Sequence, residues 1–199
     1  MKATDFNLKK EIKISFKTGE ITFKNNRYLV LDTNAMGLFR YNLIEHLGMD
    51  AARAVFLKFG YTNGYSDFME FKTGYDFDTE MELMLVGSLM HTWRGVTKAE
   101  IIKLNFDREK GEFYAHGLWL NSFECEQHLT YYKVSSQPAC WLLSGYTSGW
   151  YSAFFGSKVI SIEKMCTAKG DDHCECEIQP PDAWDYEIAK PYIEALKEF

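Results

Sequence analysis

Three of the five cysteines in this chain lie within residues 166–176, around one turn, and this cluster constrains the fold more than any other feature of the sequence. In the stretch IEKMCTAKGDDHCEC, residues 162–176, the turn KGDD separates Cys166 from Cys174, and Glu163 precedes Cys166 by three positions. Because a hairpin brings its two strand ends together, we expect these three side chains to converge. Thiolates and a carboxylate are typical zinc ligands, so a fourth donor is expected from elsewhere.

Cys140 is the candidate for the fourth donor because it lies near the start of a predicted helix, where the helix dipole favours a thiolate. Four protein donors would give a closed tetrahedral zinc site with a structural role. Cys176 follows Cys174 by two positions and faces the same way on a regular strand, so spacing leaves it as a competing ligand. Buried cysteines without a metal are the alternative interpretation.

Cysteine count and composition narrow the class of protein. An odd number of cysteines argues against a disulfide scaffold, and Cys125, on a polar helical stretch, is interpreted as a structural residue. The chain has 199 residues, 46% of them hydrophobic, which is enough for a substantial core. A net charge of −6 without a Lys/Arg cluster argues against nucleic-acid binding. The sequence lacks a membrane-spanning apolar run and a signal peptide, so we expect a cytoplasmic protein.

The order of predicted elements indicates an α+β fold, because runs of strands alternate with runs of helices instead of forming βαβ units. Residues 11–32 are typical of a short β-meander. Gly60 and Gly64, inside a helical stretch, predict close packing against another element. No internal repeat is seen. Helices are predicted at 33–48, 49–71, 78–93, 122–132, 138–156 and 182–199, the last broken near Pro191, and antiparallel hairpins at 98–121 and 158–179.

The segments WLNSFECEQHL, QPACWLLSGYTSGWYSAFFG and VISIEKMCTAKGDDHCECEI resemble the sensor domain of the XylR/DmpR group of phenol- and xylene-responsive bacterial transcription activators. The last segment also resembles the 4-vinyl-reductase-type ligand-binding domain of those sensors. The resemblance extends from about residue 10 to 180. It implies structural zinc, Zn²⁺, held by Cys140, Glu163, Cys166 and Cys174, and it leaves Cys176 out.

The resemblance also implies a buried pocket in which His91 and Trp119 hydrogen-bond the hydroxyl of an aromatic effector. The residues agree with this role, since Met84, Gly87 and Ser88 share a helix face with His91. On the strand, Gly117 lies beside Trp119 on one face and leaves space next to an indole N–H donor. The alternative is that His91 and Trp119 are ordinary core residues.

The pocket departs from the family in its walls. Where relatives present aromatic side chains, this chain has Gly117 and Ser161, and Trp150 and Met84 are expected to compensate. We therefore expect a pocket that is larger than one for phenol, or differently shaped, for an effector of the phenol, alkylbenzene or biaryl class.

The resemblance implies three parts: an N-terminal activator-sensor region over 1–110, a 4-vinyl-reductase-type domain over 111–181, and a linker helix over 182–199. In such activators the linker leads to an ATPase and a DNA-binding domain, and the effector relieves repression of the σ54-dependent ATPase. A homodimer is expected. We expect no catalytic residues, because no GxGxxG motif or flavin signature is present. The alternatives are a stand-alone small-molecule or lipid-binding interaction module, or a tetrapyrrole vinyl-reductase-like accessory protein.

Overall fold

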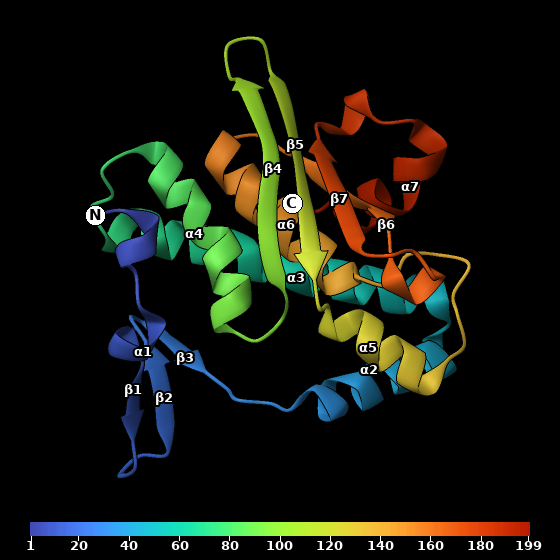
Figure 1. Cartoon of the computed structure of the whole chain (residues 1–199), viewed down its shortest axis with the longest axis horizontal. Coiled ribbons are helices and arrows are strands. Elements are labelled where there is room, and N and C mark those ends of the chain that lie inside the picture. The colour runs from blue at the N-terminus through green and yellow to red at the C-terminus, as the bar shows by residue number, and fades with distance from the viewer.

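The structure, a computed structural model, describes residues 1–199 and contains two antiparallel sheets connected by helices (Figure 1). The first sheet is a meander with the strand order β1-β2-β3, which confirms the prediction for residues 11–32. Its buried anchor is Phe23, whose ring lies against those of Phe6 and Phe71. The strands are β1 (Lys13–Ser15), β2 (Glu20–Phe23) and β3 (Asn26–Tyr28).

The second sheet has the strand order β4-β5-β7-β6, and every neighbouring pair is antiparallel. Because β5 pairs with β7, the two predicted hairpins join into one sheet that spans both halves of the sequence. Alternate residues of β5 are buried, so this strand presents one face to the core. The strands are β4 (Lys98–Asp107), β5 (Glu112–Leu120), β6 (Ile160–Met165) and β7 (Cys174–Gln179).

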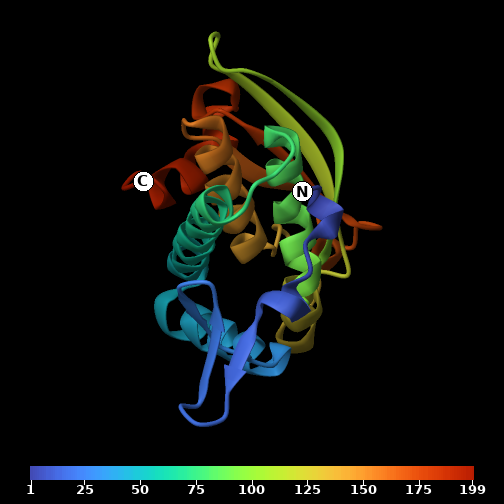
Figure 2. The same ribbon diagram turned by 90° about the vertical axis from the view of Figure 1, so that its left-hand side faces the viewer.

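Helices cover one face of the four-stranded sheet in two layers (Figure 2). Helices α4 and α6 pack on the sheet, and the long helix α3 packs on α6. None of the helices combines the length and the apolar character needed to cross a lipid bilayer. The predicted α+β fold class is confirmed. The α-helices are α1 (Leu8–Glu11), α2 (Thr33–Leu47), α3 (Met49–Gly74), α4 (Glu80–Trp93), α5 (Phe123–Tyr131), α6 (Trp141–Phe155) and α7 (Tyr186–Ala195).

Helices α3 and α6 touch backbone to backbone through two glycine pairs. The pentapeptides GYTNG (60–64) and GYTSG (145–149) lie against each other, a short sequence match that the search for repeats missed. An added Cβ on Gly64 would lie 2.9 Å from the carbonyl carbon of Tyr146, and one on Gly149 would lie 2.9 Å from that of Tyr61. The prediction that glycines in this helix mark a close approach is therefore confirmed, because only a missing side chain allows this spacing.

Most helix ends follow the predicted chemistry, with small shifts. Asp32, rather than Thr33, caps α2, since its side chain accepts a hydrogen bond from the Ala35 backbone N–H. Pro138 does not open α6, which begins at Trp141 and leaves Cys140 at the N-cap position. Short 3₁₀ turns cover Ala3–Asp5, Thr167–Lys169 and Pro181–Ala183.

The C-terminal helix is docked on the body of the protein. Residues Ala189, Tyr192 and Leu196 of this segment are buried in one cluster with Leu57 of α3 and Ile160 of β6. The predicted break near Pro191 is wrong, because α7 continues through this proline. A proline is tolerated in the helix interior when surrounding packing offsets the missing hydrogen bond, and this apolar contact is such packing.

Candidate functional site

A cavity lies between the four-stranded sheet and helices α4 and α6. Five of the six residues predicted to bind an effector line it, namely His91, Trp119, Met84, Gly117 and Trp150, whereas Ser161 does not. The sequence did not indicate Tyr146, Tyr151 or Cys176, which also line it. The complete lining is Met84, Gly87, Ser88, His91, Ala99, Glu100, Ile101, His116, Gly117, Leu118, Trp119, Tyr146, Thr147, Trp150, Tyr151, Cys176 and Ile178.

His91 is a neutral polar group in the cavity wall. It lies near the end of α4, is 7% exposed, and has its ring edge against Tyr146 with the centroids 4.7 Å apart. Burial away from water lowers the pKa of His91 to about 3, and the positive charge of Arg94 lowers it further. The imidazole therefore carries one donor nitrogen and one acceptor nitrogen at neutral pH, and neither has a hydrogen-bond partner in the protein.

The depressed pKa of His91 predicts a pH dependence of folding stability. In the unfolded chain His91 titrates near 6.5, so between about 6.5 and 3 the unfolded state binds one more proton than the folded state. The free energy of unfolding should therefore fall as pH falls through this window, by up to ~1.4 kcal/mol per pH unit from this group.

Urea denaturation of the wild type and His91→Gln at several pH values between 7.5 and 5 measures this contribution. The variant should lose less stability than the wild type on acidification. Equal slopes for the two proteins would show that His91 is not buried as a neutral group.

Trp119 supplies a second unpartnered polar group. It lies on the inward face of β5 and is 3% exposed. The indole N–H groups of Trp141, Trp150 and Trp184 donate to backbone carbonyls, whereas that of Trp119 has no acceptor in the protein. A buried indole N–H usually has an acceptor, so Trp119 is free to donate to a guest in the cavity.

Two predicted wall residues differ from the expectation of a larger pocket. The space beside Gly117 is occupied by backbone, since an added Cβ there would lie 2.8 Å from the carbonyl oxygen of Glu100. Ser161 is buried on β6, and its backbone N–H donates to Ser148 Oγ, away from the cavity lining. Neither residue therefore enlarges the chamber.

Trp150 and Met84 form an apolar wall that depends on one glycine. The Trp150 indole N–H donates to the backbone carbonyl of Met84 at 3.0 Å, so its polar atom is already used. An added Cβ on Gly87 would lie 2.7 Å from Trp150 Nε1, so only glycine allows the indole to lie against α4 at this position.

The cavity is small, with a volume of about 30 Å³. An engineered apolar cavity that holds benzene measures about 150 Å³. An aromatic ring therefore enters this chamber only if side chains move. Met84 is the most adaptable residue of the wall, because methionine has an unbranched, flexible side chain.

Tyr146 links the cavity to helix α3. Its hydroxyl donates to the Asp67 carboxylate at 2.7 Å, and Asp67 pairs with Arg94, also at 2.7 Å. Arg94 donates in turn to Asn63 and to the hydroxyl of Tyr28 in the meander. Burial raises the pKa of Tyr146 well above its usual value, so the phenol stays a donor. The cavity wall is thus held in a buried polar network that reaches the first sheet.

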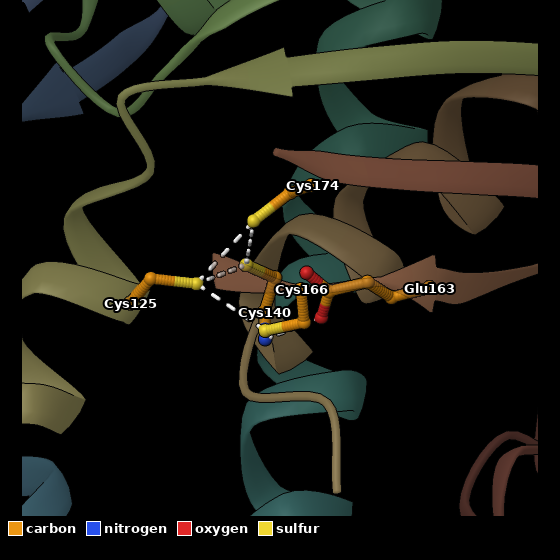
Figure 3. A group of neighbouring side chains, drawn as sticks. All are labelled: Cys125, Cys140, Glu163, Cys166 and Cys174. Atoms are coloured by element: carbon orange, nitrogen blue, oxygen red, sulfur yellow. Dashed lines mark hydrogen bonds between the residues drawn. The ribbon is translucent and has the colours of Figure 1, made fainter. Parts of the chain in front are cut away.

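The second candidate site is a buried cluster of five metal-binding side chains (Figure 3). One ligand atom from each of Cys125, Cys140, Glu163, Cys166 and Cys174 lies within 4.8 Å of the others. They come from α5, the start of α6, the two facing ends of β6 and β7, and the segment that joins those strands. The cluster is able to bind a metal ion, and it connects four segments that are distant in sequence.

The geometry of the cluster suits a cation. All four cysteines are free thiols, and the Sγ atom of Cys125 lies 3.3 Å from Cys140 and 3.4 Å from both Cys166 and Cys174. Burial raises the pKa of the Cys140 thiol and raises that of Glu163 to about 7. A cation is therefore required to keep these groups ionised together. Glu163 Oε1 is buried and has no partner in the protein, which also fits a positive ion nearby.

Backbone N–H groups support two of the sulfurs. Ala139 N lies 3.4 Å from Cys166 Sγ, and Thr167 N lies 3.4 Å from Cys174 Sγ. Such contacts orient metal ligands and stabilise negative charge on them. Cys176 lies outside the cluster and lines the cavity instead, although spacing alone left it as a competitor. Cys125 was not predicted as a ligand.

A buried ion pair fixes the helix that carries Cys125. The neighbouring Glu124 is 1% exposed, pairs with Arg40 of α2 at 3.1 Å, and accepts the backbone N–H groups of Leu142 and Leu143. One carboxylate therefore joins α5 to α2 and caps the first turn of α6. Removing one partner of such a pair strands a buried charge, so this contact holds the three helices in one arrangement.

Comparisons with known proteins agree with this architecture. The chain is 36% identical over 167 residues to the phenol regulator MopR of Acinetobacter guillouiae, covering 84% of this chain and 30% of that protein. It is 28% identical over 178 residues to the transcriptional regulatory protein XylR of Pseudomonas putida, covering 89% of this chain and 31% of XylR. The chain thus spans about three-tenths of the length of these curated relatives.

A solved structure has the same fold over nearly the whole chain. It is the crystal structure of the phenol-responsive sensory domain of the transcription activator PoxR with phenol, at a TM-score of 0.87 and 27% identity, covering 96% of this chain and 94% of that one. Residues 119–180 match the 4-vinyl-reductase-type domain. Residues 7–107, half of the chain, match the family described as activator of aromatic catabolism, and the protein therefore belongs to that family.

Proposed function

We propose that this chain is the sensor domain of a transcription activator and binds a small hydroxylated aromatic compound in the cavity. The observation that carries the proposal is the pair of unpartnered polar groups, His91 and the Trp119 N–H, on the lining of one apolar chamber. A mostly apolar cavity with a few convergent polar groups is the usual form of a small-molecule site. The likeness to MopR and to the PoxR sensory domain supports phenol as the type of effector.

The cavity volume favours a single ring. A chamber of about 30 Å³ needs side-chain movement even for benzene, and a biaryl would require far more. We therefore propose phenol and methylphenols as effectors, in preference to biaryls. The hydroxyl would donate to the free ring nitrogen of His91 and accept the Trp119 N–H, which pairs both buried groups.

Thermal unfolding with phenol, methylphenol, toluene and a biaryl tests the proposal. Phenol at about 100 times its Kd should stabilise the wild type by ~2.7 kcal/mol, which raises the melting temperature by about 5–10 °C. Toluene should raise it less, because it leaves both polar groups without a partner. In His91→Ala the difference between phenol and toluene should shrink, whereas His46→Ala, on the exposed surface of α2, should behave like the wild type.

Equal shifts for phenol and toluene in the wild type would contradict the role of the two polar groups. No shift with any of the compounds would remove the sensor assignment altogether.

The output of the sensor is proposed to leave through the C-terminal segment. An effector that binds one conformation better shifts the population toward it. Helix α7 packs on α3 and β6, and both of these elements belong to the body that surrounds the cavity. A shift there would relieve repression of an ATPase output domain beyond residue 199, working with σ54. The division into 1–110, 111–181 and 182–199 is part of this proposal, as is action in the cytoplasm; reporter transcription from the full activator measures it.

We propose Zn²⁺ as the metal and a structural role for it. The sequence predicts Cys140, Glu163, Cys166 and Cys174 as its ligands. Soft thiolates favour zinc among common divalent cations, and a site closed by protein donors has no position for a substrate. This closed shell and the regulatory relatives argue against an enzyme; turnover of an aromatic or tetrapyrrole compound by the purified chain would contradict that view.

Exposed apolar residues support the proposed homodimer. Leu29, Val30 and Leu31, between the meander and α2, are 77%, 81% and 60% exposed, and Phe39 and Phe59 continue the same groove. Isolated exposed apolar residues are common, but a contiguous patch typically marks an interface. Sedimentation equilibrium on this chain measures the association.

A further inference from the structure

We propose that Cys125 is a ligand of the metal, so that the site holds four thiolates, and that Glu163 orients Cys140 from outside the coordination shell. This inference rests on the proposed metal centre and concerns which donors form it. A structural zinc ion takes four ligands, whereas this chain brings five donors together. One of the five is therefore excess, and the contacts favour Glu163 as that one.

Sulfur–sulfur distances match a four-thiolate tetrahedron. With zinc–sulfur bonds of about 2.3 Å, the edges of a tetrahedron measure about 3.8 Å. The Sγ atom of Cys125 lies 3.3, 3.4 and 3.4 Å from those of Cys140, Cys166 and Cys174, and the Cys140–Cys174 edge is 3.9 Å. Every one of these edges lies within about half an ångström of the tetrahedral value. Cys125 is thus already at ligand distance from the other three sulfurs.

Glu163 is engaged elsewhere. Its Oε2 accepts the backbone N–H of Cys140 at 2.9 Å, which is the kind of contact that orients a metal ligand from outside the shell. Figure 3 shows Cys125 and Glu163 approaching from opposite sides, with the other three cysteines between them. One ion in tetrahedral geometry takes only one of the two. The unpartnered Oε1 makes Glu163 the rival donor that the experiment must exclude.

Cys125 is held firmly in its position. It is 2% exposed and follows Glu124, whose pairing with Arg40 and with the α6 backbone fixes this turn of α5. The extra negative charge of a fourth thiolate is offset locally, because Cys140 lies at the N-cap of α6, at the positive end of the helix dipole. Zinc also binds four cysteines in many structural sites.

X-ray absorption at the zinc edge of the purified protein, as isolated, counts the ligands directly. The wild type should show four sulfur scatterers at about 2.3 Å and no oxygen at 2.0–2.2 Å. Glu163→Gln should keep four sulfurs, Cys125→Ser should fall to three, and the control Cys176→Ser, buried outside the cluster, should keep four.

Three sulfurs and one oxygen in the wild type would overturn the inference while leaving the metal centre intact. A chain that contains no metal would overturn the metal centre itself, so the two failures are distinguishable. If Cys125→Ser does not fold, the wild-type and Glu163→Gln spectra still decide the ligand set.

Discussion

Removing the metal from the cysteine cluster is expected to cost at least about 5 kcal/mol of folding free energy, which is comparable to the whole net stability of many domains. The cluster is the only covalent-strength connection available between α5, the start of α6 and the β6–β7 hairpin, since the chain has no disulfide. Without the ion, several buried acidic groups would share one apolar space and would have to be protonated. The melting temperature should therefore fall by at least about 10 °C.

Differential scanning calorimetry before and after prolonged incubation with a strong chelator measures this loss, with metal content followed by elemental analysis. Cys166→Ser should reproduce the effect without a chelator, because it removes one ligand. Cys176→Ser should retain the metal and most of the stability. A chelated protein that has lost its metal but keeps its melting temperature would show that the cluster does not stabilise the fold.

Gly64→Ala is expected to destabilise the protein by more than about 3 kcal/mol, although alanine is normally the better helix residue. The added methyl group would lie 2.9 Å from the carbonyl carbon of Tyr146 and 3.0 Å from the backbone nitrogen of Trp150. These atoms belong to the backbone of α6 and cannot rotate away, so the two helices must separate. Because Tyr146 and Trp150 line the cavity, effector binding should weaken as well.

Gly74→Ala is the matched control, since Gly74 lies on the same helix and an added Cβ would meet only the side chain of Lys24 at 3.7 Å. This substitution should be neutral or stabilising by up to ~1 kcal/mol. Urea denaturation of the three proteins gives the comparison. If Gly64→Ala is as stable as Gly74→Ala, the close helix contact is not a source of stability.

The residues differ in how much of their role local pattern could predict. The strands at 98–121 and 158–179 and most helices follow from apolar spacing, caps and glycines, so they were predicted within a few residues. The docking of α7 on α3 was not, because apolar spacing shows that a helix has a buried face but not what covers it. Ser161 was placed at the cavity by analogy with relatives, and the structure turns it toward Ser148.

Cys125 shows the same limit at the metal cluster. Its local surroundings, SFECEQ, are polar and carry no spacing typical of zinc ligands, so the sequence pattern gave no reason to pair it with the hairpin. The one available indication was the count, since four cysteines form a complete zinc shell.

The sequence by itself determined the order and kind of the elements, the convergence of Glu163, Cys166 and Cys174 at one turn, and the residues able to anchor a hydroxyl. Tertiary structure alone decided that α5 brings a fourth sulfur to that turn, that backbone occupies the space beside Gly117, and that the resulting cavity is only about 30 Å³. The physical reason is range: periodicity, caps and turns act between residues a few positions apart, whereas cavities and metal shells depend on distances between elements that only the packed core sets.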